Sequence, residues 1–267
     1  MYEKLYEPLP DTAAYLERLG LEPPRELNRE YMDGLVYAHQ CRIPFENLDV
    51  YAFHRPISLG IADLFQKIVM NKRCGYCFEM NALFTALLNA LGYHAWACMC
   101  RILRSKDYIP PVMHRGVLVE LDGQLYFCDV GYGGPEAPGS LSVCDGARRC
   151  FGKEEYFITR ADAYWWTLSR KTSQGVSEKV MQFYTMPQEN VEFLALSEYC
   201  STSPDSIFTQ KIFLNIRTSD GFDSVLGDVF THAQNGSSEV HTIKNRQEFF
   251  RIADQYFGLR FSGAEKS

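Results

Sequence analysis

Apolar side chains recur at helical spacing through the first third of the chain. In the clearest segment the apolar residues are Met80, Leu83, Phe84, Leu87, Leu88 and Leu91. This spacing places them on one face of a helix, and Gly92 predicts where that helix ends. Asp11 or Thr12 is suited to cap an earlier helix. Two further amphipathic segments predict helices over about 28–41 and 63–70.

The hydrophobic period changes to two after residue 92. Short runs rich in Val, Tyr, Phe, Trp and Thr are separated by turn residues, and they cover 94–101, 115–121, 124–130, 151–159, 164–169 and 180–185. Punctuated runs of this kind are typical of antiparallel sheet. We therefore predict that the middle of the chain is a β-barrel or a strongly curved sheet.

The last third of the chain mixes both patterns. The expected elements are a helix over 189–199, strands near 207–218 and 224–231, a turn at Asn235-Gly236 and a terminal helix over about 245–257. The whole pattern predicts an α+β protein. Its predicted domains are a helical part (1–92), a sheet part (93–199) and a mixed part (200–267).

Charge and composition narrow the range of partners. The 267 residues carry a formal charge of −6. Nucleic acids and anionic membranes call for a basic face, so we expect neither as a partner. The N-terminal sequence lacks the pattern of a secretory signal, and no long apolar window is present. We therefore expect a cytoplasmic protein without a membrane span, and nine scattered cysteines favour reduced thiols over a disulfide framework.

Cys77 is the strongest candidate nucleophile. It follows the glycine-containing turn Arg73-Cys74-Gly75-Tyr76, at the start of the helix predicted above. Unpaired backbone N–H groups and the positive end of the helix dipole favour a thiolate at this position. Arg73 is expected to add a positive charge nearby. The alternative is an ordinary core cysteine, which is the usual role of a free thiol.

Hairpin geometry indicates a base for this nucleophile. Asp122-Gly123 between two alternating runs predicts a two-residue turn, so residues whose numbers sum to 245 face each other. Gly116 then faces Asp129, and His114 lies diagonal to Asp129 on the same face, at about 7–8 Å between backbone positions. A carboxylate on this apolar strand needs a partner, which the imidazole would supply. The alternative is a solvated pair at a sheet edge.

Cys77, His114 and Asp129 would together supply the nucleophile, base and orienting carboxylate of thiol-based acyl transfer. The sequence around them resembles the arylamine N-acetyltransferase family. The segments that carry the resemblance are Ile43-Pro44-Phe45-Glu46-Asn47-Leu48-Asp49, Arg73-Cys74-Gly75-Tyr76-Cys77-Phe78-Glu79-Met80-Asn81, His114 before Gly116-Val117-Leu118-Val119, and Asp129-Val130-Gly131-Tyr132-Gly133-Gly134-Pro135. They occur in the order and at the separations usual for the family, and they cover about the first half of the chain.

The resemblance implies a fold and a reaction. The implied fold is an N-terminal helical bundle, a central antiparallel β-barrel and a C-terminal α/β lid, with the triad arranged as in cysteine proteases. In the implied ping-pong reaction, Cys77 takes the acetyl group of acetyl-CoA and passes it to an arylamine or arylhydrazine. His114 exchanges protons, and Asp129 orients His114. No metal is expected.

Contacts to the two substrates are assigned to residues near the triad. Gly131 and Gly133 would bring backbone amides close to coenzyme A, or they simply turn the chain after the preceding strand. Arg104 belongs to a basic loop before the candidate histidine and would meet the phosphates. Phe45 and Tyr132 are expected to line an aryl pocket for the acceptor.

Cys74 stands where the family usually has glycine, and it creates a Cys-x-x-Cys with Cys77. A redox pair would need a βαβ context that is absent upstream, and a zinc site would need two further ligands at matching spacing. A reversible disulfide between these cysteines that switches the enzyme off is a further hypothesis.

The triad would also suit an amide hydrolase or transamidase, and an inactive scaffold of the same fold is a third interpretation. The sequence leaves the acceptor and the oligomeric state open.

Overall fold

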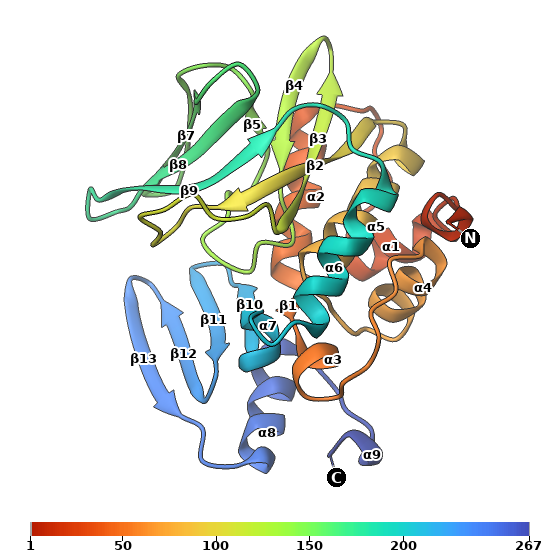
Figure 1. Cartoon of the computed structure of the whole chain (residues 1–267), viewed down its shortest axis with the longest axis vertical. Coiled ribbons are helices and arrows are strands. Elements are labelled where there is room, and N and C mark those ends of the chain that lie inside the picture. The colour runs from red at the N-terminus through yellow and green to blue at the C-terminus, as the bar shows by residue number, and fades with distance from the viewer. Residues whose placement is uncertain (1, 267) are drawn as a thin grey trace.

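The computed structural model describes residues 2–266 of the chain (Figure 1). Its N-terminal part is helical, as predicted. The elements are η1 (Glu3–Leu5), α1 (Thr12–Leu19), α2 (Arg29–Arg42), α3 (Leu48–Tyr51), α4 (Ile61–Phe65), the π-helical η2 (Gln66–Met70) and α5 (Cys77–Leu91).

Local capping sets the ends of the longer helices. The Asp11 side chain accepts a hydrogen bond from the first turn of α1, and Asn28 does the same for α2. Gly20 and Gly92 adopt left-handed conformations directly after α1 and α5, where a side chain would be strained. These helix boundaries confirm the predictions made from periodicity and capping residues.

The middle of the chain forms a nearly closed antiparallel barrel (Figure 1). Its strands are β2 (His94–Ile102), β3 (His114–Leu121), β4 (Gln124–Cys128), β5 (Leu141–Ser142), β6 (Ala147–Phe151), β7 (Glu154–Arg160), β8 (Trp165–Lys171) and β9 (Ser177–Tyr184). They are ordered β5-β4-β3-β2-β9-β8-β7-β6. The predicted barrel is therefore confirmed.

One predicted strand is split in two. The run 151–159 was expected to be continuous, but Phe151 ends β6 and β7 begins at Glu154. Gly152, with φ of +60°, turns the chain between them. Strand β6 itself escaped prediction, because the adjacent arginines Arg148 and Arg149 hide its alternation.

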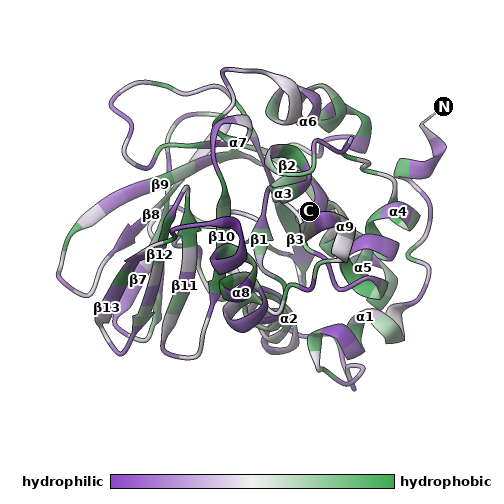
Figure 2. Cartoon of the chain, turned by 90° about the horizontal axis from the view of Figure 1, so that it is seen from below, coloured by the Kyte–Doolittle hydropathy of each residue, from purple (hydrophilic) through white to green (hydrophobic). Residues whose placement is uncertain are grey.

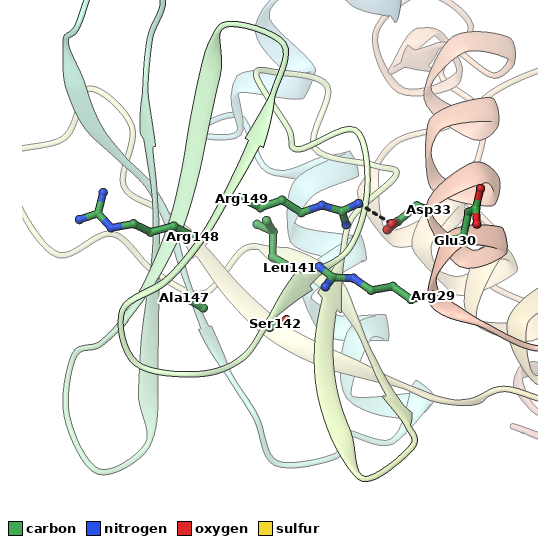
Figure 3. Close-up of a pocket in the computed structure, with 8 residues that line it drawn as sticks. All are labelled: Arg29, Glu30, Asp33, Leu141, Ser142, Ala147, Arg148 and Arg149. Carbon is green, nitrogen blue, oxygen red and sulfur yellow. Dashed lines mark hydrogen bonds and ion pairs between the residues drawn. The ribbon is translucent and has the colours of Figure 1, made fainter.

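Helix α2 is tied to the seam of the barrel, where the edge strands β5 and β6 approach each other (Figure 3). The Asp33 carboxylate on α2 accepts hydrogen bonds from Ser140 N at 2.6 Å and from Arg149 Nη2 at 2.6 Å. Arg29 Nη2 donates to the Ser140 carbonyl at 3.1 Å. Figure 3 shows Arg149 reaching toward Asp33, while Arg148 points away. Both arginines line a cavity of about 410 Å³. These bonds fix the helical part against the barrel.

The last third contains a second antiparallel sheet, whose order is β1-β10-β11-β12-β13. Its elements are β1 (Phe45–Glu46), η3 (Asn190–Glu192), α6 (Phe193–Thr202), α7 (Ile207–Gln210), β10 (Phe213–Arg217), β11 (Gly221–Leu226), β12 (Val229–Gln234), β13 (Ser237–Thr242), α8 (Arg246–Phe257) and α9 (Gly263–Lys266). The fully exposed β13 is coloured mostly hydrophilic at the periphery (Figure 2). The predicted turn at Asn235-Gly236 and the terminal helix are confirmed.

Three predictions for this region are corrected. Residues 207–210, expected to be strand, form the helical turn α7, which Ser206 caps. The run 224–231 is a hairpin turned at Gly227, not one strand. The segment 43–49, expected to be a packed loop, contributes β1, in which Phe45 pairs with Asn215 of β10. The domain boundaries at residues 92 and 199 stay a prediction.

Helix α5 lies at the centre of the molecule. Nearly all of its first twelve residues are buried, because α5 packs on other helices on one side and on β2 and β3 on the other. The helix therefore buries more than the one face that its periodicity predicts. Within residues 2–266, no helix is both long enough and apolar enough to cross a membrane.

Candidate active site

Cys77 is the first residue of α5, as predicted, and its side chain is buried. The extended Tyr76 precedes the helix, and its backbone N–H donates to Glu79 Oε2 at 3.2 Å. The Tyr76 hydroxyl is held at 2.6 Å from Ser197 Oγ on α6. The start of α5 is thus anchored on both sides, so the Cys77 sulfur has a fixed position at the positive end of the helix dipole.

His114 begins β3, and Asp129 directly follows β4. The register of these strands pairs Val117 with Cys128 and Leu121 with Gln124, as the two-residue turn predicts. His114 Nε2 lies 2.6 Å from Asp129 Oδ2. Both side chains are buried, so the alternative of a solvated pair at the sheet edge is wrong.

Asp129 is held by donors from α5, from α2 and from the loop that follows it. Its Oδ1 accepts hydrogen bonds from Asn81 Nδ2 and from Gly131 N, each at 2.9 Å. Gln40 Nε2, on α2, donates to the Asp129 carbonyl at 2.9 Å. The roles of Asn81 and Gln40 were not predicted from the sequence. Asn81 lies four residues after Cys77, on the same helix face, and that spacing was the available signal.

The Cys77 side chain interacts with the His114 ring. Because Asp129 occupies Nε2, Nδ1 is the ring nitrogen left to meet the sulfur. Burial by itself would lower the pKa of His114, but Asp129 and Cys77 outweigh burial and hold this pKa well above its ordinary value. The ring is therefore a strong proton acceptor for the thiol.

The glycines after Asp129 allow close packing around the triad. A side chain at Gly131 would come within 2.9 Å of Cys77 Cα, and Gly133 has φ of +68° with the Phe45 ring against it. The Gly131 N–H is already bonded to Asp129. The contacts of these two glycines with coenzyme A stay a prediction.

Aromatic side chains surround the triad. The rings of Tyr132 and His114 meet edge to face, with centroids 6.0 Å apart. Phe45 packs in the same hydrophobic cluster as Cys77. Phe208, on α7, lies over Phe45 at 6.0 Å between ring centroids. The sequence analysis did not single out Phe208, which reaches the site only through the tertiary fold.

Comparison with known proteins decides the family. The N-acetyltransferase family matches residues 29–266. The chain belongs to the arylamine N-acetyltransferase family. The arylamine N-acetyltransferase of Escherichia coli is 27% identical over 254 residues, which are 94% of this chain and 89% of that protein.

Solved structures of arylamine N-acetyltransferases share the fold. The enzyme from Salmonella typhimurium matches with a TM-score of 0.89 and 26% identity, over 97% of each chain. The Mycobacterium marinum enzyme in complex with CoA matches with a TM-score of 0.86 and 24% identity, over 93% of this chain and 92% of that one. The present chain is therefore an acetyltransferase, as its sequence motifs predict.

Arg73 in this acetyltransferase does not play the part expected of it. Its guanidinium pairs with Glu46 at 3.3 Å, Asp49 at 3.2 Å and Glu265 at 3.0 Å. These carboxylates neutralise its charge and hold the loop before α5. A different cation, Arg115, directly follows His114 of the triad on β3.

The remaining predicted residues lie apart from the triad. Arg104 is partly exposed and donates to Glu178 at 3.3 Å, so its contact with coenzyme A stays a prediction. Cys74 is fully buried in the cluster between the helices, whereas Cys77 packs in a separate one. Burial raises the pKa of the Cys74 thiol. Within residues 2–266, no group of three or more His, Cys, Asp or Glu side chains is placed to hold a metal.

Glu136 gives this acetyltransferase a pH-dependent stability. Burial and the charge of Asp129 raise its pKa to about 8, whereas in the unfolded chain it ionises near 4.5. Between these pH values folding takes up a proton, so the contribution of Glu136 to the free energy of unfolding falls as pH rises. We expect Glu136→Gln to exceed the wild type in melting temperature at about pH 9, with a difference that shrinks toward about pH 5.

Thermal unfolding at several pH values checks this expectation. The glutamine keeps an amide oxygen for Tyr132 N, which donates to Glu136 Oε2 at 3.1 Å, so the loop conformation is retained. A difference in melting temperature that does not change with pH would contradict the argument.

Proposed function

We propose that this acetyltransferase carries the acetyl group on Cys77 in a ping-pong reaction. The observation that supports the proposal most is the buried hydrogen bond of His114 Nε2 to Asp129 Oδ2, at 2.6 Å. This bond directs the other ring nitrogen to the thiol at the start of α5. The three side chains then have the roles of nucleophile, base and orienting carboxylate.

In the first half-reaction, His114 Nδ1 takes the proton of the Cys77 thiol. The thiolate attacks the thioester carbonyl of acetyl-CoA, and the carbon–sulfur bond to coenzyme A breaks. His114 returns the proton to the departing coenzyme A sulfur. Acetyl-Cys77 remains, and its thioester has about the same energy as the one that was cleaved, so this step needs little driving force.

In the second half-reaction, the nitrogen of an arylamine or arylhydrazine attacks the acetyl carbonyl. His114 accepts the proton that the nitrogen loses as the new amide bond forms. The Cys77 sulfur leaves as a thiolate and takes this proton from His114, so the site returns to its starting state. The buried aromatic surround of Phe45, Tyr132 and Phe208 favours an aryl acceptor over a strongly polar one.

Acetyl-CoA is proposed as the donor. The family name specifies acetyl transfer, and a relative of the same fold has been solved with CoA. The phosphates would require cations near the entrance to the site, and Arg104 is the proposed contributor from the loop before β3.

Intact-protein mass spectrometry tests the proposal. The reduced enzyme is mixed with acetyl-CoA, and an arylamine is then added. We expect one acetyl group on the wild type, none on Cys77→Ala, and loss of the group when the amine is added. The matched control Cys74→Ala should still be acetylated.

Three outcomes would overturn the proposal. A folded, reduced wild type that gains no acetyl group would mean that the donor is different or that the triad is inactive. An acetyl group that water removes as fast as the amine would favour the hydrolase interpretation. Acetylation of Cys77→Ala would place the nucleophile elsewhere.

A further inference from the structure

Arg115 is a buried arginine beside the candidate triad. It directly follows His114 on β3, and only 1% of its surface is exposed. Its Nη2 donates to Asn190 Oδ1 at 2.6 Å, and its guanidinium lies 4.6 Å from the centroid of the Phe193 ring. The buried Nε has no hydrogen-bond partner within residues 2–266.

Arg115 has no carboxylate partner among the described residues, whereas two other buried cations of this protein have several. Lys67 lies 2.6 Å from each of two carboxylates, and Arg73 pairs with three. In the described part of the chain, no carboxylate lies within ion-pairing distance of Arg115. A buried and unpaired charge is costly, by several kcal/mol. Burial accordingly lowers the pKa of Arg115 to about 10. A buried cation without an ion-pair partner, next to His114, would be stabilised by a negative charge that forms nearby during the reaction.

Cys77 is the group that can provide this charge. Phe193, which carries the Arg115 guanidinium on its ring, packs in the same cluster as Cys77. Asn81 Nδ2, on the Cys77 helix, donates to the Arg115 carbonyl at 2.6 Å and so fixes β3 against α5. A negative charge on Cys98, on β2, or on Cys77 favours the charged form of Arg115, and Cys77 is the one of the two at the start of a helix.

We propose that Arg115 is the internal counter-ion of the Cys77 thiolate. The inference rests on the proposed function, in which the thiolate is the nucleophile. When Cys77 is a thiolate and His114 is protonated, four buried side chains carry charge. Cys77 and Asp129 are negative, and His114 and Arg115 are positive. Without Arg115 this set would carry a net negative charge in a dry interior, and the proton would return to sulfur. Arg115 is thus a positioning residue, because it acts through Cys77 by stabilising the negative charge of the thiolate.

Other titratable groups around Cys77 are neutral at physiological pH or are bound elsewhere. The neutral ones are Tyr6 near η1, Tyr76 before α5, Cys100 on β2, Tyr132 after β4 and Cys200 on α6, whose pKa values burial raises. On α5 itself, Glu79 pairs with Lys67 at 2.6 Å. Within residues 2–266, Arg115 and His114 are therefore the cations left to balance a negative charge on Cys77.

The test measures the rate at which iodoacetamide alkylates Cys77 as a function of pH, with the modified residue identified by peptide mass. The variants are Arg115→Gln, which removes the charge, and Arg115→Lys, which keeps it. Arg148→Gln is the control, because it removes a half-exposed arginine of β6 that pairs with Glu155. The exposed Cys144 and Cys150 serve as internal references for an ordinary thiol.

We expect the midpoint of the pH–rate profile of Cys77 to rise by about one pH unit or more in Arg115→Gln. Arg115→Lys should lie near the wild type, and Arg148→Gln should match it. An unchanged midpoint in a folded Arg115→Gln would overturn the inference. A purely structural role would lower the melting temperature without moving the midpoint.

If Arg115→Gln does not fold, a second variant tests the same inference. Asn190→Asp places a carboxylate beside Arg115 Nη2 and competes with the thiolate, so the Cys77 midpoint should again rise. An unchanged midpoint would count against the counter-ion. Failure of the proposed function is distinguishable, since it would appear as an unacetylated wild type, whatever the alkylation profile of the variants.

Discussion

Replacing Asp129 with asparagine is expected to slow acetylation of Cys77 by about 10³–10⁴-fold while the fold is retained. Two donors, Asn81 Nδ2 and Gly131 N, hold the Oδ1 position, so the side-chain oxygen of the asparagine will stay there. The amide NH₂ must then face His114 Nε2. This forces Nε2 to accept and moves the ring proton to Nδ1, the nitrogen that must take the proton of the thiol.

Single-turnover acetylation, followed by intact mass, gives the rate for this variant. Asp122→Asn is the matched control, because Asp122 is exposed on the same hairpin with φ of +52°, which asparagine tolerates. It should acetylate at the wild-type rate. A rate for Asp129→Asn within about tenfold of the wild type would show that the carboxylate does not set the tautomer of His114.

Replacing Lys67 with methionine is expected to destabilise the protein by about 3–5 kcal/mol. Lys67 Nζ lies 2.6 Å from Asp49 Oδ2 and 2.6 Å from Glu79 Oε1, and its side chain is 19% exposed. Burial already raises the pKa of Glu79 to about 7, against the opposing charge of Lys67. Without the lysine, a buried carboxylate at the start of α5 would lose its cation. Denaturant unfolding at neutral pH measures the loss.

The double variant Lys67→Met with Glu79→Gln isolates the cause. Glutamine keeps an oxygen for Tyr76 N but carries no charge, so a large part of the lost stability should return. Lys4→Met is the surface control, since Lys4 and Asp63 are both more than half exposed and 3.7 Å apart. It should change stability by about 1 kcal/mol or less. A double variant no more stable than Lys67→Met would point to lost packing instead of an unpaired charge.

The hairpin that carries His114 and Asp129 was predictable because its information is local. A two-residue turn at Asp122-Gly123 sets the pairing of every residue in both strands, and the observed register follows that rule. The position of Cys77 at the start of α5 was predictable for a similar reason, since Gly92 and the apolar spacing delimit the helix. Each of these features depends on residues close in sequence.

Charge partners were not predictable in this way. Arg73 was expected beside Cys77, yet it pairs with Glu265, which is 192 positions away in the chain. Gln40 donates to the carbonyl of Asp129, which is 89 positions away in the chain. Asn47 donates to the carbonyl of Phe208 on α7, which is 161 positions away. Such pairs leave no periodic signal in the sequence, because the two partners belong to different elements that meet only after folding.

The sequence by itself determined the longer helices, most barrel strands, the hairpin register and therefore three residues of the candidate site, because helix period, caps and turn geometry act over a few residues. Only the tertiary structure decided that β1 joins β10, that Phe208 covers Phe45, and that Arg115 is buried with no ion pair to a carboxylate of the described residues. Burial and electrostatic environment are properties of the packed chain. They depend on which distant elements exclude water from a side chain, and a linear pattern does not contain that information.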